Sequence, residues 1–166
     1  MSKLLTTTIA SPIGKLFILS RADVLLGLNL SGFQDLLSSL SSHELEEKIG
    51  KSPKLPGISD KLADYFDGDL KAINSIKVKQ PGGDFSQSAW SAMRKIKAGT
   101  TESYSDLAHR AGSPAAVRAA GSACAKNKIA IVIPCHRIVK TGGAIGAYGW
   151  GINKKIWLLE HEGALA

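Results

Sequence analysis

The sequence predicts an α/β protein of two small domains, residues 1–82 and 83–166. The 166 residues are 44% hydrophobic and 21% charged, which is typical of a folded chain rather than a disordered one. Short β-type runs and tight turns fill the first half, whereas helical patterns dominate the second. The strongest loop signal, Gln80-Pro81-Gly82-Gly83-Asp84, lies between the two halves and sets the predicted boundary.

Strands and turns open the first domain. Four segments have the alternation or β-rich composition of strands: Thr6–Ala10, Lys15–Ser20, Val24–Leu30 and Ile76–Val78. Ser11-Pro12-Ile13-Gly14 is typical of a turn, so we expect an antiparallel sheet. Residues 36–40 and 44–49 are ambiguous and weakly helical. Ser59 can cap a helix over Asp60–Phe66.

Helices dominate the second domain. Ser86 can cap a helix through Lys95, and Asn153 leads into a last helix over Lys154–His161 that Gly163 closes. Between them, a short helix over 103–111 ends at Gly112, and Ser113-Pro114 begins another that runs to Ala125. Two helices joined by a tight glycine turn form the plan of a helix-turn-helix.

The second helix of that pair is unusually slender. It consists almost entirely of Ala, Gly, Ser and Val, and Arg118 is its only charge before Ala125. Such a helix fits either a narrow groove on a partner or a tightly packed core. Ile129–Ile133 follows as a predicted buried strand or extended run, and residues 141–151 form a glycine-rich loop.

Charge is concentrated in the second half of the chain. The net charge of +7 divides into +1 for residues 1–82 and +6 for residues 83–166. This excess favours an anionic polymer as partner, although a basic surface kept for solubility is the alternative. No apolar run approaches the roughly 20 residues that span a bilayer, and the start lacks a signal-peptide core. We therefore expect a cytoplasmic protein with no membrane partner.

Cysteine and histidine usage argues against metal binding and disulfides. The two cysteines, Cys124 and Cys135, and the four histidines have no metal-ligand spacing, so no metal site is predicted. Cys135 instead follows an apolar run that Pro134 stops, and His136 comes next. A thiol beside an imidazole is a candidate nucleophile, because the thiolate is the reactive form. An inert buried cysteine beside a surface histidine is the alternative, and either Glu162 or Asp106 could orient His136.

Several motifs of the second half resemble the O6-alkylguanine-DNA alkyltransferases. The resemblance covers about residues 85–163, and the first 80 residues match loosely, mainly at Ser11–Gly14. The segments that carry it are Phe85-Ser86-Gln87 with Trp90, Gly99, Ser103–Ala108, Val117–Gly121, Asn127, Ile133–Val139, Gly146–Tyr148 and Trp157–Gly163.

This resemblance implies a chemistry for Cys135. The sulfur would take the alkyl group from O6 of guanine in DNA and keep it, so that each molecule acts once; O4-alkylthymine is a further candidate substrate. His136 would draw the thiol proton through a water, with Glu162 behind it. Asn127 would fix the turn that presents the thiol. Tyr104 would donate a hydrogen bond to N3 of the leaving purine. No cofactor is implied.

The resemblance also implies how DNA is held. Arg118 would enter the stack in place of a flipped-out guanine, with the slender helix in the minor groove. The expected DNA contacts are Ser103, Tyr104, Arg118, Ala119, Ala120 and Gly121. The expected walls of the base pocket are Pro134, Ile138, Tyr148, Gly149 and Trp150.

For the architecture, the resemblance implies a ribonuclease-H-like first domain and a second domain with a winged helix-turn-helix. It also implies a monomer that binds double-stranded DNA containing O6-alkylguanine. Two other functions remain open on the sequence. A lesion sensor would flip the base without transferring anything, and a Cys-His hydrolase would turn over repeatedly on acyl substrates and ignore DNA.

Overall fold

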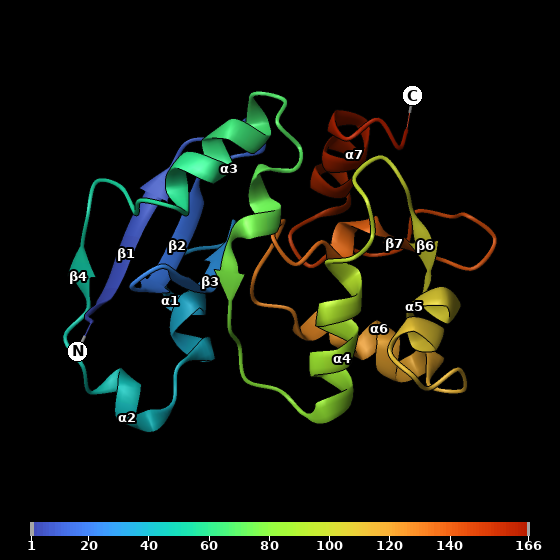
Figure 1. The fold of residues 1–166 in the computed structure, drawn as a ribbon, viewed down its shortest axis with the longest axis horizontal. Coiled ribbons are helices and arrows are strands. Elements are labelled where there is room, and N and C mark those ends of the chain that lie inside the picture. Colours follow the sequence, from blue (N-terminus) through green and yellow to red (C-terminus); the bar gives the residue numbers. More distant parts are fainter. Residues whose placement is uncertain (1, 166) are drawn as a thin grey trace. The chain divides into compact units, whose positions relative to one another are not determined.

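The computed structural model describes residues 2–165, and contacts divide these into two compact units (Figure 1). Unit 1 holds the chain up to Pro81 together with Lys128–Val132, and unit 2 holds Gly82–Asn127 and the chain from Ile133 onward. The predicted division at residue 82 put 128–132 in the second domain. In the structure this segment belongs to unit 1, because Leu28 N donates to Lys128 O at 3.0 Å and Ala130 N donates to Leu28 O at 2.9 Å.

A five-stranded mixed sheet forms the centre of unit 1. Its order is β4-β1-β2-β3-β5, with the bounds β1 Leu4–Ile9, β2 Leu16–Arg21, β3 Val24–Asn29, β4 Gly50–Lys51 and β5 Lys77–Val78. Strands β1, β2 and β3 pair antiparallel, as predicted from the Ser11–Gly14 turn. The edge strands β4 and β5 pair parallel to their neighbours, so the sheet is mixed, whereas we expected an antiparallel sheet. Long connections precede both edge strands, and such connections allow parallel pairing.

Both faces of the central strand β2 are covered. Ile18 and Leu19 are consecutive, so they point to opposite faces, and both are fully buried. Leu19 belongs to one apolar cluster with Leu4, Leu26, Leu36 and Leu40. The ambiguous segment of the sequence supplies Leu36 and Leu40 to this cluster and forms three short helices. They are α1 Phe33–Leu36, the 3-10 helix Leu37–Ser39 and α2 Ser42–Leu45.

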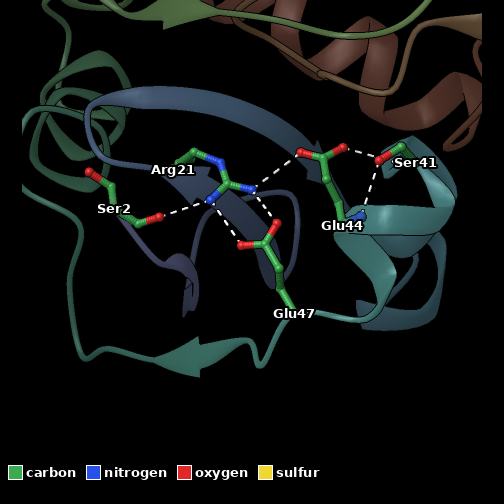
Figure 2. Close-up of polar contacts among 5 residues, drawn as sticks. All are labelled: Ser2, Arg21, Ser41, Glu44 and Glu47. Atoms are coloured by element: carbon green, nitrogen blue, oxygen red, sulfur yellow. Dashed lines mark hydrogen bonds and ion pairs between the residues drawn. The ribbon is translucent and has the colours of Figure 1, made fainter.

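Arg21 at the end of β2 ties this strand to α2 (Figure 2). Its guanidinium donates to both Glu47 carboxylate oxygens at 3.0 and 2.7 Å and to Ser2 O at 2.8 Å. Glu44 lies 3.4 Å away and also closes a capping box with Ser41 at the start of α2. Since these side chains are about one quarter to one third exposed, each pair contributes little alone and the cluster acts mainly as a local brace.

Two predicted helix caps differ from the structure. Helix α3 spans Ser59–Phe66, but Ser59 lies inside it, and the Ser59 hydroxyl exchanges hydrogen bonds with Leu55 N and O at 2.9 and 3.1 Å. Helix α4 spans Asp84–Met93 with Gly83 as its N-cap, three residues earlier than the Ser86 cap predicted. The N-cap residues are Ile58 for α3 and Gly83 for α4, instead of the two serines.

Four helices build unit 2. They are α4, α5 Tyr104–Arg110, α6 Val117–Lys126 and α7 Ile152–His161. Helices α4, α5 and α6 pack on one another, and Trp90 Nε1 in α4 donates to Ala123 O in α6 at 2.9 Å. Helix α6 starts three residues after Pro114, because Ser113–Ala116 forms a turn closed by Ala116 N and Ser113 O at 2.9 Å. The predicted Ser113-Pro114 start was wrong.

The apolar run before the candidate nucleophile is buried but is not a strand. Ile129 makes an isolated parallel bridge to Leu28, after which the chain turns. Ile131 has φ of 69°, a left-handed conformation that β-branched residues rarely adopt, so strand geometry ends there. Among residues 2–165, no helix is long and apolar enough to cross a membrane.

Candidate active site

Two short parallel strands bring distant parts of unit 2 together. Strand β6 (Glu102–Ser103) pairs with β7 (Ile138–Val139), with Ser103 opposite Val139. Tyr104 and Lys140 directly follow these partners. Because the carboxyl ends of parallel strands meet at one edge, both residues lie at the same place. This pairing could not be predicted from the sequence, since each strand has only two residues.

Cys135 begins a single 3-10 turn, Cys135–Arg137, immediately before β7. Asn127, which ends α6, fixes that turn. Its Nδ2 donates to Ile133 O at 3.0 Å and to Cys135 Sγ at 3.4 Å. Cys135 is 6% exposed and Asn127 is 2% exposed, so this contact is screened from water. The structure thus holds the sulfur through a side chain eight residues upstream.

His136 is fully buried and pairs with Glu162, at the end of α7. His136 Nε2 lies 2.9 Å from Glu162 Oε2, while the other open candidate, Asp106, accepts from Ser103 N at the start of α5. A carboxylate at Nε2 keeps the proton of neutral His136 on that nitrogen. Nδ1 is then an acceptor, and it has no hydrogen-bond partner among residues 2–165.

Arg137 anchors Glu162 from the other side. Arg137 Nε donates to Glu162 Oε1 and Nη2 donates to Oε2, both at 2.9 Å, and Nη1 donates to Ile96 O at 2.7 Å. Burial alone would raise the pKa of the Glu162 carboxyl, but His136 and Arg137 outweigh it and hold the pKa far below its usual range. Glu162 is therefore a fixed anion that orients the imidazole.

The resting state of this site is neutral at the sulfur and the imidazole. Burial raises the pKa of the Cys135 thiol, although the Asn127 hydrogen bond and the Lys155 charge oppose the rise. Burial also lowers the pKa of His136, against the pull of Glu162. A protonated thiol close in sequence to an unprotonated imidazole nitrogen has the composition of a nucleophile–base pair before reaction.

Lys155 was missed by the sequence analysis. It lies on α7 and is fully buried, and its ammonium donates to Ile138 O at 2.6 Å and to Ala147 O at 3.2 Å. It thereby joins the strand after the nucleophile to the glycine-rich loop. Burial lowers the pKa of the Lys155 ammonium. A lysine on a helix is normally expected to be exposed, so sequence alone carried no signal for this position.

A cavity of about 290 Å³ opens beside these strands. Its lining comes from three segments: Tyr104 at the start of α5, Val117, Arg118 and Gly121 of α6, and Lys140 and Thr141 after β7. Tyr104 is half-buried, and burial raises the pKa of its phenol, so it remains a hydrogen-bond donor. Val117, Lys140 and Thr141 were not among the predicted site residues.

The remaining predicted DNA contacts differ in exposure. Arg118 is exposed and Ala119 partly so, but Ala120 is fully buried in unit 2. Consecutive helical residues turn by about 100°, so α6 cannot present all of them to one partner. The Ser103 hydroxyl caps α5 by accepting from Asp106 N at 3.0 Å. Ala120 is therefore left out of the contacts proposed below.

The predicted pocket walls come from the segment around Cys135 and from the glycine-rich loop. Pro134 and Ile138 are buried, Gly149 is exposed, and the rings of Tyr148 and Trp150 meet edge to face with centroids 5.2 Å apart. Over residues 2–165, none of these five lines the 290 Å³ cavity. The structure brings Cys135, His136, Glu162 and Asn127 together, and places Tyr104 with Arg118 and Gly121.

Metal ligands are not gathered in the described chain. Across residues 2–165, no group of three or more His, Cys, Asp or Glu side chains is close enough to hold a metal ion. The second cysteine, Cys124, lies on α6 and is a free thiol. Burial raises the pKa of the Cys124 thiol, as it does for Cys135.

Comparison with known proteins gives one consistent family. The family model described as 6-O-methylguanine DNA methyltransferase, DNA binding domain, matches residues 84–164. The methylated-DNA–protein-cysteine methyltransferase of Salmonella typhimurium strain LT2 is 36% identical over 170 residues, covering 99% of each protein. The Mycobacterium tuberculosis H37Rv protein of the same name is 37% identical over 155 residues, covering 93% of this chain and 90% of its own.

Solved structures agree with these relatives. A crystal structure of Mycobacterium tuberculosis O6-methylguanine methyltransferase has a TM-score of 0.79 and 35% identity, covering 98% of this chain and 94% of that one. A structure of the Mycobacterium tuberculosis protein in complex with DNA also has a TM-score of 0.79, with 36% identity over 96% of this chain and 93% of that one. With its fold and sequence matched over nearly their whole length, the chain belongs to the methylated-DNA–protein-cysteine methyltransferase family.

Proposed function

We propose that this protein repairs O6-alkylguanine in double-stranded DNA by moving the alkyl group to Cys135 in a single turnover. The family name specifies a protein cysteine as acceptor, and the chain has two. The observation that carries the choice is the buried pair of Glu162 with His136, the residue that follows Cys135. Within residues 2–165, this pairing leaves Nδ1 of His136 as an acceptor with no hydrogen-bond partner. Cys124 is a free thiol whose neighbours in the sequence are Ala123 and Ala125.

The proposed step balances without a cofactor. The Cys135 Sγ–H proton passes through a water to His136 Nδ1, and the sulfur attacks the alkyl carbon in line. The S–C bond forms as the C–O6 bond breaks, and the electron pair stays on guanine. Guanine then recovers a proton from the imidazolium. Because the thioether has no leaving group as good as guanine, the protein is not regenerated.

Other residues serve the same step. Asn127 holds Sγ in the turn through its Nδ2, at 3.4 Å. The Tyr104 phenol donates to N3 of the purine while charge builds on the leaving guanine, a role that requires the protonated phenol its raised pKa favours. We further assign Pro134, Ile138 and the loop residues Tyr148, Gly149 and Trp150 to the walls of the base pocket.

We propose that α5 and α6 act as a winged helix-turn-helix on DNA, with α6 in the minor groove. Arg118, Ala119 and Gly121 face the duplex, and the guanidinium fills the space of the flipped-out base. The complex of the Mycobacterium tuberculosis protein with DNA supports a DNA partner for this chain. The sheet of unit 1 supports a ribonuclease-H-like topology.

The transfer is tested with a duplex oligonucleotide that carries one isotope-labelled O6-methylguanine. The wild type and Cys124→Ala should both acquire label, whereas Cys135→Ala should bind the duplex and acquire none. Label on Cys124 in the wild type, or equal labelling of Cys135→Ala, would contradict the proposal. Binding without labelling by the wild type would identify the lesion-sensor alternative, and repeated ester hydrolysis without labelling would identify the hydrolase.

The role of Arg118 is tested by comparing two substrates. Arg118→Ala should slow transfer from the duplex on the order of tenfold or more, because nothing then offsets the few kcal/mol that unstacking costs. Transfer from the free base O6-benzylguanine should be unchanged, since no base has to be flipped. An equal loss on both substrates would contradict the finger role and indicate a damaged site.

A further inference from the structure

Two residues that line the cavity beside β6 and β7, Lys140 and Thr141, have no part in the proposed reaction. The Thr141 hydroxyl lies 3.4 Å from the Ser105 hydroxyl, joining the loop after β7 to α5. Lys140 precedes Thr141 and lines the same cavity as Tyr104 and Arg118. The loop after β7 thus brings a lysine and a threonine to the cavity, and the threonine joins this loop to Ser105 of α5.

The position of Lys140 is fixed by its backbone and by the strand register. Lys140 N donates to Ala144 O at 2.8 Å, and Gly143 N donates to Lys140 O at 2.9 Å, which closes a tight turn. A Cβ placed on Gly146 would lie 3.4 Å from the Tyr104 hydroxyl and 3.5 Å from Lys140 Cγ. Gly146 thus lies between the Tyr104 hydroxyl and the stem of the Lys140 side chain.

The charge of Lys140 is not neutralised within the protein. Across residues 2–165, Arg110 pairs with Glu102 and Arg137 pairs with Glu162, whereas the Lys140 ammonium has no carboxylate partner. An exposed ammonium with neighbouring hydroxyls matches the oxygens of a phosphodiester. The rest of the lining, such as Val117 and the Tyr104 ring, suits a sugar and a base instead.

We infer that Lys140, Thr141 and Ser105 bind a phosphodiester of the DNA strand that carries the damaged nucleotide, next to the extruded base. The inference rests on the proposed function. It adds Lys140 to Arg118 as a second cationic side chain that contacts the DNA. When a nucleotide leaves the stack, its phosphates move with it, and they need a partner that the duplex no longer provides. Arg118 cannot serve while it fills the gap left by the base.

The test uses the full chain and the charge-neutralising variant Lys140→Gln, with Lys97→Gln as control. Lys97 is also exposed and lies in unit 2, so both variants lose one charge. Lys140→Gln should slow transfer from the methylated duplex on the order of tenfold, the factor expected for one lost hydrogen bond to a charged group. Transfer from free O6-benzylguanine should be unchanged in both variants.

Two further measurements identify the phosphate. The slope of log Kobs against log salt concentration should be shallower by about 0.9 in Lys140→Gln. Single methylphosphonate linkages are then placed along the lesion strand. One linkage beside the lesion should slow the wild type on the order of tenfold and leave Lys140→Gln unaffected. Thr141→Val should show a smaller loss on the duplex only.

The inference and the proposed function fail in different ways. If the wild type transfers the methyl group but Lys140→Gln matches Lys97→Gln on the duplex, the phosphodiester site is wrong and the proposed function stands. A loss in Lys140→Gln that no methylphosphonate position reproduces would also overturn the site. If the wild type transfers nothing from the duplex, the proposed function itself has failed.

Discussion

Replacing Glu162 by alanine removes the centre of the buried polar cluster. The carboxylate holds His136 Nε2, Arg137 Nε and Arg137 Nη2, each at 2.9 Å. Arg137 is 2% exposed, so the variant leaves a buried guanidinium without its carboxylate, bonded through Nη1 to Ile96 O. Breaking a buried pair in this way costs about 3–5 kcal/mol. For a chain of this length, that corresponds to a fall in Tm of roughly 6–20 °C.

The same change should disable the proposed base. Without a carboxylate at Nε2, His136 loses its fixed tautomer and orientation, and transfer from O6-benzylguanine should slow by about 10² or more. Assays run below the Tm of the variant separate this effect from unfolding. Glu160→Ala is the matched control, because Glu160 is exposed on the same helix and should shift neither quantity.

The pH dependence gives a further check on Glu162. The pKa of the carboxyl is lowered in the folded state. Its contribution is therefore present above the unfolded pKa of about 4.3 and is lost as pH falls through the folded pKa. The stability gap between wild type and Glu162→Ala should narrow in acid. A Glu162→Ala protein as stable and active as Glu160→Ala at neutral pH would refute this reasoning.

The other predictions concern pH and packing. Burial lowers the pKa of His136, so the folded state resists protonation, and the unfolding free energy should fall as pH drops below about 6.5. In urea titrations between pH 6.5 and 5, His136→Gln should flatten that slope by up to about 1.4 kcal/mol per pH unit. The exposed-site variant His109→Gln should keep the wild-type slope. Equal slopes in the two variants would contradict a buried neutral imidazole at His136. A Cβ on Gly82 would meet the Trp90 ring at 2.5 Å, so Gly82→Ala should cost about 1–3 kcal/mol in the same titrations. A Cβ on Gly83 meets nothing within 4 Å, so Gly83→Ala should cost less than about 1 kcal/mol, and identical values for the two would show that the ring yields.

Local patterns predicted much of unit 1. Strands β1, β2 and β3 and the Ser11–Gly14 turn follow from alternation and turn residues, which act over a few positions. The run 129–133 has the same composition as a strand but turns at Ile131, because its partners lie on β3 and not on a neighbouring segment. Pairing with a strand that is distant in the sequence cannot be predicted from the pattern of neighbouring residues.

Some residues of the candidate site could likewise be predicted from the sequence, and others could not. The neighbours Cys135 and His136 could be selected from the Pro-Cys-His sequence, since thiol and imidazole chemistry is carried by residue type. The choice of Glu162 over Asp106 could not, because it depends on where α7 ends relative to the 3-10 turn. The burial of the Lys155 ammonium could not be predicted from the sequence either, since its acceptors are backbone carbonyls rather than side chains.

The most direct test measures what happens to the sulfur when damaged DNA is in excess. The protein is incubated with a molar excess of duplex containing O6-methylguanine, and its intact mass and peptides are analysed over time. The account predicts a gain of one methyl group per chain, located on Cys135, followed by no further loss of lesions from the DNA. Unmodified Cys135, or continued repair beyond one lesion per molecule, would contradict it.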